Sequence, residues 1–124
     1  MKILHLDIET APMIVYAWGL WQQNIAISQI AEPGHSICYS AKWHKSKKVF
    51  FDSVNKSGNK QMLEGIHALL DEADAVCTYN GVKFDIPTLN KEFVKADMPP
   101  PPPYKQIDLL KVARRVFRFP SYGS

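Results

Sequence analysis

The sequence predicts a single α/β domain built around a mixed β-sheet, with a three-strand antiparallel meander, parallel strands and flanking helices. The first half of the chain consists of short β-branched and aromatic runs of strand length. The second half alternates one-sided helical stripes with short apolar strands. A run of strands followed by helix, strand, helix, strand and helix is typical of a mixed sheet with helices packed on its faces.

Composition places the chain among soluble globular domains. Its 124 residues suffice for one domain, 1–124, and 46% hydrophobic with 22% charged residues are ordinary values for such a domain. No apolar run approaches the length of a membrane span and no signal peptide opens the chain, so a cytoplasmic protein without a membrane partner is expected. Cys38 and Cys77 have no metal-type spacing, which favours reduced thiols. The net charge of +3 permits nucleic-acid binding without requiring it.

Four strands are expected in the first half of the chain. The first carries an apolar run at residues 3–8. Three more are expected at residues 13–20, 36–43 and 49–54, and these would form an antiparallel meander beside the first. The basic stretch of residues 44–48 is expected to be a hairpin connection.

A helix and a buried strand are expected next. Residues 55–59 are expected to be a loop in which Ser57 or Asn59 caps the helix that follows. That helix carries a one-sided apolar stripe, formed by Met62, Leu63, Ile66, Leu69 and Leu70. The short apolar run at residues 74–79 then predicts a strand parallel to the first, because a helix of this length is the crossover that parallel strands require.

The remaining elements are a helix, a strand end and a last helix. Residues 84–96 are expected to be helical, with Pro87 in the first turn, where proline is tolerated. Residues 107–110 are expected to be a strand end that leads into the last helix. Between them, residues 99–103 are all proline and predict an extended polyproline II segment, either a stiff spacer or a ligand for an SH3-type domain.

Two carboxylates are set into the first strand. Asp7 and Glu9 are two positions apart, so on a strand both project from the same face. Two like charges held together on a mostly apolar strand are costly unless a cation neutralises them, and Mg²⁺ or Mn²⁺ prefers such oxygen ligands. The alternative interpretation is the solvated end of a strand, because a triplet of this kind also occurs by chance.

A second acidic position follows the predicted parallel strand. Asn80 turns the chain there, and Asp85 stands at the start of the next helix, where a carboxylate can also serve as the N-cap. In open α/β sheets, ligands bind at the carboxyl ends of the strands. If the two strands are parallel and close, Asp7, Glu9 and Asp85 converge at one edge of the sheet, which favours a metal site over the alternatives.

Three stretches of the chain resemble the motifs of a known family. Residues 7–10 read Asp-Ile-Glu-Thr, residues 80–85 read Asn-Gly-Val-Lys-Phe-Asp, and residues 108–114 read Asp-Leu-Leu-Lys-Val-Ala-Arg. The first two resemble the first and second exonuclease motifs of the DEDD superfamily, the proofreading-type, DnaQ-like 3′–5′ exonucleases with a ribonuclease H-like fold. The third is similar to a stretch that often precedes the third motif of that family. The matches run in order from residue 4 to about residue 117.

The resemblance implies a catalytic site and its substrate. Asp7, Glu9 and Asp85 would hold two divalent metal ions, Mg²⁺ or Mn²⁺, and hydrolyse phosphodiester bonds at the 3′ end of DNA or RNA by a two-metal mechanism. Three further positions would bind the substrate: Thr10, Asn80 and Phe84. The implied partners are the 3′ end of single-stranded DNA or RNA and a polymerase or other replication protein, in the cytoplasm of a bacterial or phage-infected cell.

The third motif of the family is missing from these residues. It consists of a Tyr or His followed by the fourth metal-binding Asp, and it would lie beyond the helix after Asp108. Tyr122 has no acidic residue after it, so no general-base role is assigned to it. A C-terminally truncated form of the fold is therefore expected. Asp108 itself is expected to be a helix N-cap that supports the site.

Two other classes of function stay open. A truncated or degenerate exonuclease fold could act as a nucleic-acid-binding or polymerase-associated module without activity. A ribonuclease H-like endonuclease or resolvase is disfavoured, because ribonuclease H takes its second carboxylate from a helix, whereas Asp7 and Glu9 share a strand. Five aromatic residues could stack bases, although core and strand packing is the simpler interpretation: Tyr16, Trp18, Trp21, Tyr39 and Trp43. Phe84 is also expected to pack in the core. Six basic residues are candidates for phosphate contacts: Lys45, Lys47, Lys48, Arg114, Arg115 and Arg118.

Overall fold

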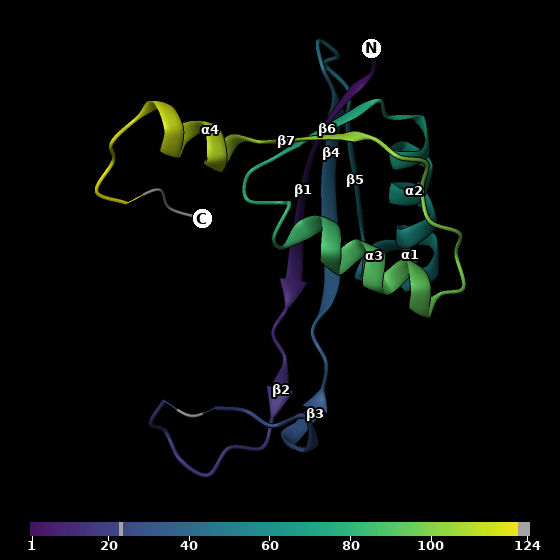
Figure 1. Cartoon of the computed structure of the whole chain (residues 1–124). Helices are drawn as coiled ribbons and strands as arrows, with labels where there is room; N and C mark the ends of the chain where they lie inside the picture. The colour runs from purple at the N-terminus through teal and green to yellow at the C-terminus, as the bar shows by residue number, and fades with distance from the viewer. Residues whose placement is uncertain (23, 122–124) are drawn as a thin grey trace.

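The chain folds around a mixed five-stranded sheet flanked by helices, which confirms the predicted fold class (Figure 1). The computed structural model describes residues 1–22 and 24–121, so Tyr122 lies outside the described residues. The strand order is β5-β4-β1-β6-β7, with β1 (Ile3–Ala11) in the centre. On one side of β1 the neighbours are antiparallel, and on the other side they are parallel.

The antiparallel half of the sheet consists of β1, β4 (His35–Trp43) and β5 (Val49–Ser53). These three strands form an antiparallel meander, in which β1 takes the place expected for residues 13–20. The prediction of a strand over residues 13–20 is wrong, however. Only β2 (Ile14–Val15) is extended there, and it pairs with β3 (Ile30–Glu32) in a separate two-stranded ribbon beyond the ends of β1 and β4 (Figure 1). The 3₁₀ turn η1 (Ile27–Gln29) precedes β3.

The connection after β5 is helical from its start. A short helix, α1 (Val54–Ser57), precedes α2 (Asn59–Glu72), so the expected loop at residues 55–59 is wrong. Ser53 caps α1, because its Oγ accepts the backbone N–H of Lys56. The N-cap of α2 is Gly58, so the expected cap at Ser57 or Asn59 is wrong. Gly58 separates the two helices with φ 82°, a conformation that favours glycine. All five residues of the predicted stripe on α2 are buried.

The parallel half of the sheet is formed by β1, β6 (Ala75–Thr78) and β7 (Lys105–Asp108). α3 (Asp85–Lys95) follows β6, and α4 (Leu109–Val116) follows β7. The proline run connects α3 to β7, and the carbonyl oxygen of Pro99 lies 2.6 Å from His67 Nε2 on α2. Among the described residues, no helix combines the length and the apolar character needed to cross a membrane.

The hydrophobic core lies on one face of the sheet. Leu4, Leu6 and Ile8 of β1 point to this face and pack with the buried residues of α2 and α3. In Figure 1, α2 lies to the right of β1 and β4, α3 runs across these strands toward the right, and α4 lies to the left. A buried polar contact joins α3 to β4, because the carboxylate of Glu92 accepts both the backbone N–H and the hydroxyl of Ser36. Among the described residues, no residue of α4 belongs to this core cluster.

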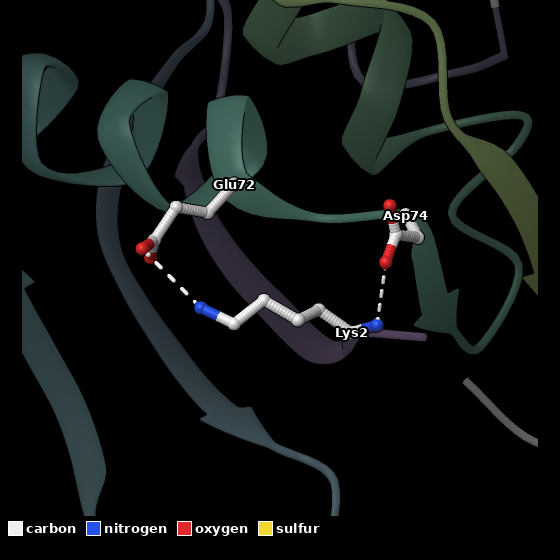
Figure 2. A network of polar contacts seen from close by, with 3 residues as sticks. All are labelled: Lys2, Glu72 and Asp74. Atoms are coloured by element: carbon white, nitrogen blue, oxygen red, sulfur yellow. Dashed lines mark hydrogen bonds and ion pairs between the residues drawn. The ribbon is translucent and has the colours of Figure 1, made fainter.

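Lys2 joins the start of β1 to the connection between α2 and β6 (Figure 2). Its backbone N–H donates to Asp74 Oδ2 at 2.7 Å, and its Nζ lies 3.2 Å from Glu72 Oε1. The Lys2 carbonyl oxygen accepts the backbone N–H groups of Asp74 and Ala75, at 2.9 and 3.1 Å. The two backbone hydrogen bonds hold β1 in its parallel register with β6, whereas the exposed ion pair of Lys2 with Glu72 contributes little. The register in turn sets how far the acidic end of β1 extends past the end of β6.

Candidate active site

The acidic side chains of β1 lie on the face opposite the core. Leu6 and Ile8 are buried, whereas Asp7 and Glu9 are exposed on the alternate face. Pairing with β6 stops at His5, so the following residues of β1 have β4 on one side and no described strand on the other. Both carboxylates thus stand at the carboxyl end of the parallel strands, where ligands bind in open α/β sheets.

A tight turn after β6 brings the chain back toward this edge. Asn80 adopts φ 60°, a left-handed conformation that asparagine tolerates better than most residues. The backbone N–H of Gly81 donates to Thr78 Oγ1 at 3.1 Å, and a Cβ at Gly81 would overlap the Thr78 side chain. The backbone N–H of Ile86 then donates to the Gly81 carbonyl oxygen at 2.8 Å, which starts α3. A glycine is therefore required at position 81.

Asp108 ties this turn to the end of β7. It is buried, and its Oδ1 accepts the backbone N–H of Asn80 at 2.7 Å and that of Leu110 at 3.0 Å. The second bond makes Asp108 the N-cap of α4, as expected from the sequence. The first bond joins two turns that are 28 residues apart in the chain. Asp108 therefore positions the loop that leads to Asp85.

Asp85, the first residue of α3, has a pKa raised to about 6. Burial raises this pKa most, and a hydrogen bond from the backbone N–H of Ile8 lowers it. Repulsion from three neighbouring carboxylates raises it further: those of Asp7, Glu9 and Asp108. The N-cap position of α3 is occupied by Phe84, so Asp85 is not the helix cap that the alternative interpretation expected. The structure thus gathers negative charge from β1, α3 and β7 at one edge of the sheet.

The donor set fits a hard divalent cation. Asp7, Glu9 and Asp85 offer only carboxylate oxygens, the ligands that Mg²⁺ and Mn²⁺ prefer. Within residues 1–22 and 24–121, no three His, Cys, Asp or Glu side chains are already close enough together to hold a metal ion. Burial contributes most to the raised pKa of Asp85, and the charges of Asp7 and Glu9 add to it; a cation between the carboxylates would remove that repulsion. These three residues are the ones that would hold it.

The residues expected to bind substrate lie around this edge. Thr10 is exposed and follows Glu9 directly, at an irregularity in the pairing of β1 with β4. Phe84 is exposed, so its expected core packing is wrong, and its side chain stands next to Asp85 in the chain. Asn80 is half-buried in the turn. Contact of these three residues with a substrate stays a prediction.

Lys42 borders the same region, although the sequence alone assigned it no role. It pairs with His5 across β1 and β4. Both side chains line a depression of about 450 Å³ on the open face of the sheet, together with Asp7 and Tyr79. A lysine here places positive charge in the same depression as the carboxylate of Asp7. Only the register between β1 and β4 reveals this neighbourhood, and that register cannot be seen in the sequence pattern.

Fold and site together define an α/β domain with carboxylates gathered where its central parallel strand ends. A family model described as the RNase_H superfamily matches residues 4–123, and the chain belongs to this superfamily. No curated protein matches the chain. Among solved structures, the family B DNA polymerase from the hyperthermophilic archaeon Pyrobaculum calidifontis resembles it with a TM-score of 0.65 and 13% sequence identity. The match covers 93% of this chain and 16% of the polymerase chain, and at this identity it shows the fold alone.

Proposed function

We propose that the chain is a metal-dependent nuclease domain that removes nucleotides from the 3′ end of DNA or RNA. The observation that carries the proposal is the position of Asp85, whose carboxyl accepts a hydrogen bond from the backbone N–H of Ile8 and so stands against the strand end that carries Asp7 and Glu9. Membership in the RNase_H superfamily supports a nuclease reaction. The 3′–5′ direction rests on the likeness of residues 7–10 and 80–85 to the exonuclease motifs. A polymerase or another replication protein is the proposed partner, which agrees with the fold shared with a DNA polymerase.

In this proposal Asp7, Glu9 and Asp85 hold two divalent ions, Mg²⁺ or Mn²⁺. When bound, the ions supply an activated water and stabilise the charge that develops on the leaving 3′ oxygen. The chain itself supplies position and electrostatics. Asp108 holds the turn at Asn80, so that α3 presents its first carboxylate toward β1.

The substrate would lie along the open edge of the sheet. Thr10 and Phe84 are exposed on either side of the carboxylates in this proposal and would contact the last nucleotide. Asn80 would orient the loop between them. Lys42 would contact a backbone phosphate from the neighbouring depression. The site does not need to enter a groove of a double helix, because the end of a single strand exposes both its bases and its phosphates.

A second candidate is a nucleic-acid-binding module without activity. It is favoured by one observation: among the described residues, no three potential metal ligands are already grouped. Such a domain would bind a strand at the same edge without hydrolysing it.

A cleavage assay separates the two candidates. The protein is incubated with a 5′-labelled single-stranded oligonucleotide and Mn²⁺ or Mg²⁺, and the products are resolved by length. We expect a ladder that shortens from the 3′ end, and a rate at least about a hundredfold lower for Asp7→Asn and Glu9→Gln.

The matched control is Glu72→Gln, a carboxylate on the exposed network of Lys2 and remote from the site in the chain. It should cleave like the wild-type protein. The absence of a ladder with either metal ion would favour the binding module. Full activity of Asp7→Asn would contradict the assigned site.

A further inference from the structure

The connection between β1 and β4 exposes three aromatic side chains within six positions. We define the aromatic arm as residues 12–34, of which the structure describes all but residue 23. It contains β2 and β3 and projects beyond the end of the main sheet (Figure 1). Tyr16, Trp18 and Trp21 are 74%, 91% and 87% exposed. The expectation that these rings pack in the core is therefore wrong.

Polar contacts at the base hold the arm in shape. The backbone N–H of Tyr16 donates to the Gln29 carbonyl oxygen at 2.7 Å, and Gln29 Nε2 donates to the Tyr16 carbonyl oxygen at 2.8 Å. Gln29 Oε1 also accepts the backbone N–H of Ala26 at 2.9 Å. Gln29 thus joins the two chain segments at the base of the arm, one at Tyr16 and the other at Ala26. Since only backbone atoms of Tyr16 take part in these bonds, its ring is left facing solvent.

The aromatic arm continues directly from the candidate active site. β1 carries Glu9 and Thr10, and the arm begins two residues later. The chain returns beside the same strand end, because Thr10 pairs with Ser36 across β1 and β4. The aromatic arm therefore leaves the sheet at the end of β1 that carries the carboxylates of the candidate site.

The chemistry of the aromatic arm points to bases rather than phosphates. Residues 10–31 contain no charged side chain, and no Lys or Arg occurs anywhere in residues 3–41. Such a surface cannot neutralise phosphates, which is the usual source of nucleic-acid affinity. Exposed indole and phenol rings can instead stack on unpaired bases, an interaction that tolerates any sequence. The arm could therefore hold a strand beside the acidic site through its bases, without any charged side chain of its own.

We propose that Tyr16, Trp18 and Trp21 form a stacking platform for unpaired bases next to the 3′ end held at the carboxylates. This inference rests on the proposed function for its substrate, single-stranded nucleic acid. It assigns the arm to substrate bases and not to a second protein. Binding through the arm needs no metal ion and no hydrolysis, so it can be measured apart from the reaction.

The test measures affinity without divalent ions. A fluorescein-labelled single-stranded oligonucleotide is titrated with the full chain in EDTA, and the Kd is read from anisotropy. Trp18→Ala and Trp21→Ala are each expected to raise the Kd at least about fivefold. Ile27→Ala is the matched control, because Ile27 is 88% exposed on the same arm and has no ring. It should change the Kd less than about twofold.

A second measurement uses an abasic oligonucleotide of the same length. It keeps the phosphates and removes the bases, so Trp18→Ala should no longer weaken binding. An equal Kd for wild-type and both tryptophan variants would overturn the proposal. So would a loss with Ile27→Ala as large as with Trp18→Ala, which would indicate an apolar protein-docking surface. If the tryptophan effects appear but no cleavage ever does, only the nuclease proposal fails.

Discussion

Asp85 is the residue whose environment departs most clearly from that of an ordinary carboxyl group. Its pKa is raised from 3.8 to about 6, first by burial and then by the charges of its acidic neighbours. A carboxyl group with a raised native pKa binds its proton more tightly in the folded than in the unfolded state. The contribution of Asp85 to the free energy of unfolding therefore falls as the pH rises from about 3.8 to about 6, where Asp85 ionises in the native protein.

Asp85→Asn should remove this pH-dependent loss. Asparagine keeps the size of the side chain and an oxygen for the Ile8 N–H, but it carries no charge to repel its neighbours. We expect the variant to match the wild-type melting temperature near pH 4 and to exceed it at pH 7, measured by thermal unfolding in buffers without metal ions. Asp71→Asn, on the exposed side of α2, is the control for general charge effects. A difference between Asp85→Asn and wild type that is the same at every pH would contradict this account.

Some site residues could be predicted one by one, and others could not. The common face of Asp7 and Glu9 follows from strand alternation, which is a local property. The cap at Asp108 follows from its place before a helix, but its bond to Asn80 joins distant parts of the chain. Phe84 was expected in the core because of its apolar ring, yet it is exposed, since hydrophobicity alone does not fix which side of a turn faces solvent.

At the scale of elements, α4 is held by one buried side chain. Leu110 is 4% exposed, whereas its neighbour Leu109 is 46% exposed. Val112 and Val116 also face solvent on this helix. The anchor of α4 is therefore Leu110, the second residue after the cap Asp108.

The two adjacent leucines offer a matched pair of substitutions. Leu110→Ala should lower the free energy of unfolding by about 2–5 kcal/mol, because it removes buried methyl groups and leaves a cavity. Leu109→Ala should lower it by less than about 1 kcal/mol, because its side chain is already half in solvent. Denaturant unfolding of both variants measures the difference. Equal losses would show that α4 packs differently.

The wrong prediction of a strand at residues 13–20 shows why strands are harder to predict from sequence than helices. Its composition is β-branched and aromatic, which is typical of strands. However, a strand is stabilised by its partner, and here the pairing of β2 with β3 covers only Ile14 with Glu32 and Val15 with Ile30. The residues after Val15 in this segment are not paired in a strand and carry exposed rings of the aromatic arm. By contrast, the stripe on α2 was predictable because its period reflects the helix itself.

On the scale of the whole molecule, the site depends on three elements meeting at one sheet edge. β1, α3 and the β7–α4 junction each contribute one acidic position or more. Such a gathering opposes folding unless a cation is present. Bound cations should therefore stabilise the entire domain and not only the site.

Mn²⁺ should raise the melting temperature of the wild-type protein. A ligand that binds only the native state, at about one hundred times its Kd, adds about 2.7 kcal/mol to the free energy of unfolding. Asp7→Asn and Glu9→Gln should lose most of this gain, whereas Glu72→Gln should keep it. The measurement is thermal unfolding across a Mn²⁺ titration with an EDTA reference. A full gain in Asp7→Asn would rule out the assigned ligands.

By itself, the sequence determined the features that depend on neighbours along the chain. These are the alternation that puts Asp7 and Glu9 on one face, the buried stripe of α2 and the crossover that makes β6 parallel to β1. Only the tertiary structure decided that the carboxyl of Asp85 stands against the end of β1 and that the aromatic arm leaves the sheet. Both depend on pairing and burial between segments far apart in sequence, where the free energy of many contacts outweighs the preference of any one residue.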